Sequence, residues 1–448
     1  MHRPRSGPTT WAPKARRLLA VVSLAAALCG TAHAQGLVEL YETARAFDAT
    51  YLAARAQADA AEYRAAQANA LGLPTLSANI RGVATQVDLP RGASGDNNAL
   101  QGGLNGRMPL FNRANQAAME QAQRALIASR AELESAEQDL IIRLSQAYFD
   151  VLAGKDDVAL AKTNKTYILE QLASAKRNFE VGTATITDTR EAQSRADLAT
   201  AQEIAAENAL LNRRIALAYL VGRRDVEPLP LATPVVLPTV MPANVEEWVT
   251  VADTLHPQVT RARAALEVAK LEIDKAKAGE LPTIDAVASV GANKATGDSI
   301  IPGTTRSASV GVELNWPLYT GGAVQNRIKE TVSLEQRSRE EFESARRTVA
   351  QNTRVAYFGV QSGEALVKAL EAAESSSRLS LEATQLGYKV GVRVNIDVLN
   401  AQTQLFQTQR DLFKSRYDVL VNSLRLRQAS GQLTPNDLLA VNSLLARR

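Results

Sequence analysis

The residue types that carry out covalent or metal chemistry are scarce in this chain. Cysteine occurs once, as Cys29, and His256 is the only histidine after residue 33. A lone histidine cannot build a histidine-rich metal site or a nucleophile–base set, and no phosphate-binding glycine loop is present. We therefore expect no catalytic, cofactor-binding or metal-binding residues and no enzyme activity. We expect His256, which precedes Pro257, to be a surface residue near a helix start.

The first 34 residues have the pattern of a secretory signal peptide. They hold five basic residues and no acidic ones, and the apolar run 18–28 is followed by the tripeptide Ala-His-Ala. This pattern predicts cleavage between Ala34 and Gln35, and the apolar run is too short to span a bilayer. The processed chain would keep 46 basic against 47 acidic residues and no cysteine. We expect an exported protein with no disulfide, no lipid anchor and no nucleic-acid partner.

The second half of the chain restates the first at an offset of 208 or 209 residues. The matching segments are residues 70–76 with 278–284, 108–111 with 316–319, 147–149 with 356–358, and 179–182 with 388–391. A fixed period is the signature of duplicated structural units. Equal spacing in two divergent halves indicates that both halves meet one geometric constraint.

The repeat divides the chain into segments. We place the first repeat at 35–222, the second at 248–431 and a C-terminal tail at 432–448. Between the repeats, residues 223–247 contain five prolines, which exclude a continuous helix and mark a linker.

Each repeat contains two segments in which apolar and polar residues alternate. This period predicts strands with one apolar and one polar face, at about 73–87, 99–111, 281–294 and 306–319. Trp316 and Tyr319, like Phe111, fall at strand ends, where the aromatic girdle of a membrane barrel would lie. A periplasmic hairpin packed on helices accounts for the alternation equally well.

Two long segments, 112–180 and 322–389, lack proline and nearly lack glycine. We expect each to be one helix of about 100 Å, followed by a turn and a shorter returning helix at 188–222 or 397–430. Two apolar series recur every seven residues in the last of these, namely Leu399, Phe406, Phe413 and Leu420, and Leu405, Leu412, Val419 and Leu426. Two apolar seams favour packing on both sides, as in a cylinder of helices. A two-helix rod with one seam is the alternative.

Four strands cannot close a barrel, because the smallest membrane barrels use eight strands. Open sheet edges are not tolerated in lipid. If these strands span a membrane, the protein must be an oligomer. Two chains would supply eight strands and three chains twelve, and the residue pattern alone does not choose between them.

The two turns share the pattern V-G-x5-D, at residues 181–188 and 390–397, and residues 316–322 read W-P-L-Y-T-G-G. With the duplicated plan, these motifs resemble the TolC family of outer-membrane efflux and type I secretion proteins over essentially the whole processed chain. The resemblance implies a mainly helical fold with a small β part, as long coiled-coil α-hairpins with two β-hairpins per chain. Such chains assemble as a homotrimer with a shared twelve-stranded β-barrel and a twelve-helix periplasmic tunnel.

The same resemblance implies location in the outer-membrane lipid, with extension into the periplasm. It implies a periplasmic adaptor and an inner-membrane transporter of the ABC or proton-driven kind as partners. The function would be a passive exit duct of a tripartite export machine, for proteins by type I secretion or for small toxic compounds. A soluble periplasmic coiled-coil structural protein is the alternative, and a nutrient porin would need no long helices.

In this family, polar links between neighbouring coils close the tunnel at the helical turns. By position, the resemblance places Thr187, Asp188, Tyr388 and Arg393 there, and it implies an Asp188–Arg393 pair and a bond to the Tyr388 hydroxyl. Two acidic rings are implied near the narrowest point. Asp397 matches one ring, but Asn400 occupies the position of the other, which implies weaker block by cations.

The turn residues also have a purely structural interpretation. Gly182 and Gly391 have the place of glycines that end helices. Asp188 followed by Glu191 is typical of a capping pair at a helix start, and Asp397 could serve as a cap in the same way.

Overall fold

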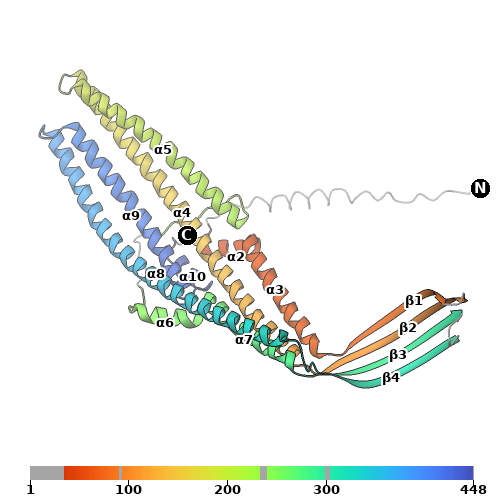
Figure 1. Ribbon diagram of the computed structural model, residues 1–448. Coiled ribbons are helices and arrows are strands. Elements are labelled where there is room, and N and C mark those ends of the chain that lie inside the picture. Colours follow the sequence, from red (N-terminus) through yellow and green to blue (C-terminus); the bar gives the residue numbers. More distant parts are fainter. Residues whose placement is uncertain (1–34, 90–92, 233–239, 298–302, 447–448) are drawn as a thin grey trace, which may run out of the picture.

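The computed structural model describes residues 35–89, 93–232, 240–297 and 303–446, so the predicted signal peptide at 1–34 lies outside the described residues. The molecule is elongated, with a sheet at one end and two helical turns at the other (Figure 1). The helices are α2 (Leu37–Phe47), α3 (Ala49–Asn69), α4 (Arg113–Glu180), α5 (Ile186–Val221), α6 (Val245–Leu255), α7 (Pro257–Lys277), α8 (Ala323–Lys389), α9 (Asn395–Ala429) and α10 (Asp437–Asn442). The strands are β1 (Thr75–Leu89), β2 (Ala93–Phe111), β3 (Thr283–Gly297) and β4 (Gly303–Asn315).

The two long helices extend from the sheet to the turns. Helix α4 has 68 residues and α8 has 67, so each is about 100 Å long. Near the turns α4 packs against α5 and α9, and near the sheet it packs against α3 and α7. Helix α8 packs against α7 and α9 (Figure 1). Each repeat therefore pairs one continuous helix with a column made of two shorter helices.

In the first part of each repeat, a capping residue separates a short helix, α2 or α6, from the helix that packs near the sheet, α3 or α7. Asp48 separates α2 from α3, and its Oδ1 accepts from the backbone N–H of Tyr51 at 2.8 Å. His256 separates α6 from α7, and its Nδ1 accepts from the N–H of Gln258 at 3.1 Å. His256 lies at a helix start, as predicted, but it is half-buried rather than on the surface, and burial lowers its pKa. It packs against the backbone of Gly431.

A large apolar core lies at mid-height, where α2, the linker and α10 pack around α4 and α9. Its fully buried members include Leu37, Leu40, Tyr41, Leu140, Leu144, Tyr148, Phe149 and Leu420. The predicted linker and tail thus contain helical segments, because α6 begins at Val245 and α10 lies within the tail.

The duplicated Tyr-Phe pairs have the same geometry in the two repeats. The rings of Tyr148 and Phe149 meet edge to face with centroids 5.5 Å apart, and those of Tyr357 and Phe358 do the same at 5.5 Å. Each tyrosine hydroxyl donates to a backbone carbonyl of the segment that follows the first repeat, at Leu229 (3.0 Å) and Ala243 (2.5 Å). The repeated motif therefore fastens the linker to each long helix.

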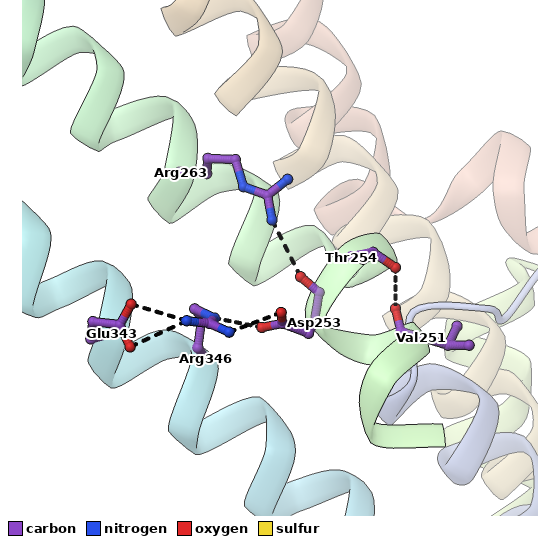
Figure 2. Close-up of polar contacts among 6 residues, drawn as sticks. All are labelled: Val251, Asp253, Thr254, Arg263, Glu343 and Arg346. Carbon is purple, nitrogen blue, oxygen red and sulfur yellow. Dashed lines mark hydrogen bonds and ion pairs between the residues drawn. The ribbon is translucent and has the colours of Figure 1, made fainter. Parts of the chain in front are cut away.

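Helix α6 is fastened to α8 by a cluster of ion pairs (Figure 2). Arg346 binds both carboxylate oxygens of Asp253, at 2.6 and 3.0 Å, and also contacts Glu343 at 3.1 Å. Hydrogen bonds from Arg346 hold the pKa of Asp253 below its usual range. Arg263 of α7 donates to the backbone carbonyl of Asp253 at 3.3 Å, so three helices meet at this residue.

The four strands form one antiparallel sheet in the order β1-β2-β3-β4. Strand β4 ends at Asn315, four residues before the predicted end, because Pro317 has no N–H to offer a neighbouring strand. Trp316 and Tyr319 therefore follow the strand, in the segment that leads to α8. No helix in the described part of the chain is long and apolar enough to cross a membrane.

Candidate functional site at the helical turns and the sheet

Both helical turns are built on a glycine in the left-handed region. Gly182 has φ +76° and Gly391 has φ +79°, a conformation that costs other residues free energy. In the first turn the N–H of Thr183 donates to the carbonyl of Asn178 at 2.8 Å, and in the second the N–H of Val392 donates to Gly387 at 2.9 Å. The two tips thus have the same backbone design, which holds each returning helix against its long helix.

Asp188 is engaged in capping the start of α5. Its Oδ2 accepts from the backbone N–H of Thr185 at 2.9 Å and from the Thr185 hydroxyl at 2.7 Å. The N–H of Asp188 donates back to that hydroxyl at 3.2 Å, so the two residues form a capping box. The helix begins at Ile186, two residues before the predicted start, and the partner of Asp188 is Thr185 rather than Glu191.

Arg393 and Asp397 lie together at the second turn. The Arg393 Nη1 is 3.7 Å from Oδ2 of Asp397, within one helical turn, and the Arg393 side chain is exposed. Asp397 also accepts from the N–H of Val394 at 3.4 Å, at the start of α9. Asp397 therefore both caps α9 and pairs with Arg393. Helix α9 begins at Asn395, two residues earlier than predicted.

Near the turns, two hydrogen bonds link the helix pair α4–α5, the first coil, to the helix pair α8–α9, the second coil. Asn178 donates from Nδ2 to the hydroxyl of Tyr388 at 3.1 Å. Arg195 of α5 donates from Nη2 to Oδ1 of Asn400 on α9 at 3.1 Å. Neither Asn178 nor Arg195 was singled out from the sequence. No spacing in the sequence distinguishes these two residues from the other polar residues of α4 and α5.

The pairing expected between Asp188 and Arg393 is not formed within the described residues of one chain, because each side chain has a local partner. Thr187 is the second residue of α5 and is exposed. The residues expected at a closure thus gather at one end of the molecule, and the cross-links between coils run through Tyr388 and Asn400.

A buried polar contact continues the link between coils above the turns. Gln402 of α9 donates to Asn164 of α4 at 3.5 Å, and both side chains are buried. Further along the same seven-residue series of α9, Gln409 and Arg416 bind Glu374 and Glu371 of α8, at 3.0 and 2.8 Å. A polar seam between apolar seams fixes the register of packed helices, so the heights of the two turns are tied to each other.

At the other end, the pairing register sorts side chains onto two faces of the sheet. One face carries rows such as Leu76, Gly106, Ala288 and Val310, and Ala78, Leu104, Val290 and Ala308. The opposite face carries rows such as Ser77, Asn105, Ser289 and Ser309. The apolar side chains are exposed, with 84% of Ile80 and 87% of Val310 accessible. A sheet with one exposed apolar face is suited to contact with lipid.

Long paired helices that end in such a sheet are the architecture expected of a membrane-anchored duct. A family model described as outer membrane efflux protein matches residues 40–223 and 248–432, and the chain belongs to that family of channel proteins. The two matched segments correspond to the two repeats.

Named relatives extend over most of the chain. It is 29% identical to the outer membrane protein TolC of Vibrio cholerae over 92% of this chain and 94% of the relative. It is 28% identical to the proteases secretion protein PrtF of Dickeya chrysanthemi over 95% and 94%, and 31% identical to the alkaline protease secretion protein AprF of Pseudomonas aeruginosa over 68% and 64%.

Solved structures agree on the fold. A membrane protein from Pseudomonas aeruginosa has a TM-score of 0.78 at 21% identity, covering 88% of this chain and 93% of that one. The outer membrane protein VceC of Vibrio cholerae has a TM-score of 0.74 at 20% identity, covering 88% and 96%. Family and fold together identify the chain as an outer-membrane exit duct for efflux and type I secretion that extends into the periplasm.

Proposed function

We propose that three copies of this chain close into one continuous duct. The proposal rests on the sheet, which has an open edge on both of its sides. Strands β1 and β4 each pair with a single neighbour within the chain. Because open edges are not tolerated in lipid, β4 of one copy must pair with β1 of the next. Three copies give twelve strands, as the family resemblance implies, and leave no edge.

The helices support the same closure. Helices α5 and α8 lie at opposite sides of the helical layer, and each has large apolar side chains exposed. They include Ile204, Leu211, Ile215 and Tyr219 on α5, and Val355, Phe358 and Leu366 on α8. Apolar stripes on both edges fit a heterologous contact in which α5 of one copy packs on α8 of the next.

The duct acts with partners that supply the energy. We propose a periplasmic adaptor and an inner-membrane transporter, of the ABC or proton-driven kind, beneath the helical turns. The names of AprF and PrtF concern secretion of proteases, and SepC of Pseudomonas putida, 25% identical, is named as a probable efflux pump outer membrane protein. The cargo class is therefore a protein or a small toxic compound. The chain itself would do no catalysis and need no cofactor.

The turns serve as the gate in this proposal. The bonds of Tyr388 and Asn400 hold the coils together at the periplasmic end, and the Arg393–Asp397 pair orders the second turn. Each exposed contact contributes about 1 kcal/mol or less. Three copies of several such contacts form a latch that a partner can release.

Disulfide cross-linking tests the closure. Leu211 lies 25 residues after the start of α5 and Leu366 lies 23 residues before the end of α8, so the two side chains stand at similar heights above the turns. A chain with Leu211→Cys and Leu366→Cys should give disulfide-linked trimers in the outer membrane. The background is clean, because Cys29 lies in the predicted signal peptide.

A matched control combines Leu211→Cys with Val355→Cys, which lies 11 residues before Leu366 on the same face of α8, or about 16 Å away along the helix. This pair should stay uncross-linked. Equal cross-linking of both pairs, or of neither, would contradict the proposed contact of α5 with α8.

A further inference from the structure

The apolar face of the sheet carries two basic side chains close to its outer end. Lys294 on β3 pairs with Thr304, and Arg306 on β4 pairs with Ala292. The two are therefore diagonal neighbours on the same face, about 7–8 Å apart between their Cα atoms, within reach of one small group for side chains of this length. Both are exposed, and neither forms an ion pair with another residue in the part of the chain that the structure describes.

These two residues end an otherwise apolar band. Towards the helices, the same face of β4 carries Ala308, Val310, Val312 and Leu314, and that of β3 carries Ala292, Val290, Ala288, Ala286 and Ile284. Asp96 on this face lies four positions beyond Leu100, which is opposite Lys294, and the register places Asp88 of β1 further out still. Four residues of strand span about 13 Å, too far for an ion pair.

The length of the band matches a bilayer. Arg306 precedes Trp316 by ten residues, which is about 33 Å along an extended strand. At a strand tilt of about 40° the separation along the membrane normal is roughly 25 Å, the height of the apolar band of outer-membrane barrels. With Trp316 at the inner interface, the basic pair lies at the headgroups of the outer leaflet.

Shallow hollows in the sheet lead away from the basic pair. One is lined by Ala78, Ile80, Leu104, Val290, Ala292 and Ala308, with Arg306 at its end. A second adjoins it through Leu104, Val290 and Ala308, and reaches Leu76, Gly106, Ala288 and Val310. Small residues between larger ones leave room for a hydrocarbon chain. The combination of an apolar trough and two cations at its outer end fits an acylated molecule with an anionic head.

We propose that Lys294 and Arg306 bind the phosphate of a phosphorylated glycolipid of the outer leaflet, with one acyl chain along the trough. The inference rests on the proposed membrane position of the sheet. Two like charges side by side repel each other, and a phosphate between them removes that repulsion. Arg offers a planar fork for phosphate oxygens and Lys a point charge. The duct would thereby be held at a fixed height in the outer leaflet.

Native mass spectrometry of the protein in neutral detergent tests this, with bisphosphorylated lipid A and its dephosphorylated form as probes. Each basic residue near an anionic headgroup contributes about five-fold in affinity, or roughly 25-fold for the pair. The unaltered protein should prefer the phosphorylated lipid by about that factor. The double variant Lys294→Gln with Arg306→Gln should lose the preference.

Arg81→Gln is the matched control, because Arg81 lies on the opposite face in the row of Gln101, Asn293 and Thr305, at the same height. It should keep the preference. A double variant that still prefers the phosphorylated lipid, or an equal loss in Arg81→Gln, would overturn the proposal. The same spectra count the chains. Absence of a trimer would speak against the proposed function, whereas a trimer without lipid preference would speak against this inference alone.

Discussion

Arg195 on α5 donates to Asn400 on α9 at 3.1 Å and joins the returning helices of the two repeats behind their turns. Asn400 occupies the position at which the family resemblance implies a second acidic ring. With an amide at this place, Asp397 is the acidic residue of α9 nearest the proposed constriction. Among the described residues, Arg195 binds this neutral amide and forms no ion pair.

Asn400→Asp should make the pore more sensitive to block by a trivalent cation. Three added carboxylates around a narrow opening raise the local concentration of cations, and we expect block at a several-fold lower concentration. Conductance of single channels in planar bilayers measures this. Asn400→Ser, which adds no charge, should behave like the unaltered protein. An unchanged blocking concentration in Asn400→Asp would place residue 400 away from the pore.

Tyr388→Phe should raise single-channel conductance. The change removes the hydroxyl that accepts from Asn178 and keeps the ring. The free energy that favours the closed state therefore falls by about 0.5–1.5 kcal/mol in each copy. Tyr63→Phe is the control, because that residue is exposed on α3, in the half of the molecule near the sheet. If both variants conduct alike, the Asn178–Tyr388 bond is not part of the closure.

Arg393→Ser should also open the pore. It removes the exposed ion pair with Asp397 that orders the second turn, and the effect should shrink at high salt, because exposed pairs are screened. Conductance measured at low and high ionic strength tests this. A closed pore with unchanged conductance at both salt concentrations would show that Arg393 has no part in the latch.

Asp48→Asn should destabilise the fold at neutral pH by about 1–3 kcal/mol. Asp48 is buried and bound by Arg143 through two bonds of 2.9 and 3.0 Å, whereas asparagine preserves the cap of α3. Arg143 lowers the pKa of Asp48, so the folded protein binds this proton more weakly than the unfolded chain. The stabilisation is complete above the unfolded pKa, near 3.9, and is lost as pH falls through the folded pKa.

The midpoint of thermal unfolding, followed by helical circular dichroism in detergent, should therefore differ between Asp48→Asn and the unaltered protein at pH 7 and converge below pH 4. Asp59→Asn, at an exposed site on α3, should change little at either pH. A difference that persists unchanged in acid would assign the role of Asp48 to packing rather than to its charge.

The long elements of the fold could be predicted because their signals are local and repeated. The proline-free segments gave α4 and α8 within a residue or two, and the alternation located four strands. The bond between Asp48 and Arg143 was not predicted, since the two residues lie 95 positions apart in the sequence. The end of β4 was missed although Pro317 marks it, because the alternation continued to Trp316.

The site was predictable to the level of its position but not its contacts. The shared turn pattern located Gly182 and Gly391. The partners Asn178 and Arg195 lie on helix surfaces without a distinguishing spacing, and their roles follow from how α4, α5, α8 and α9 align in three dimensions. Asp188 was assigned a distant partner, whereas Thr185, three residues earlier, satisfies its carboxylate.

The most direct test of the whole account is the native mass of the protein extracted in detergent from the outer-membrane fraction. A duct closed by three copies predicts a membrane-bound species of three processed chains. A soluble monomer or dimer in the periplasmic fraction would contradict the account.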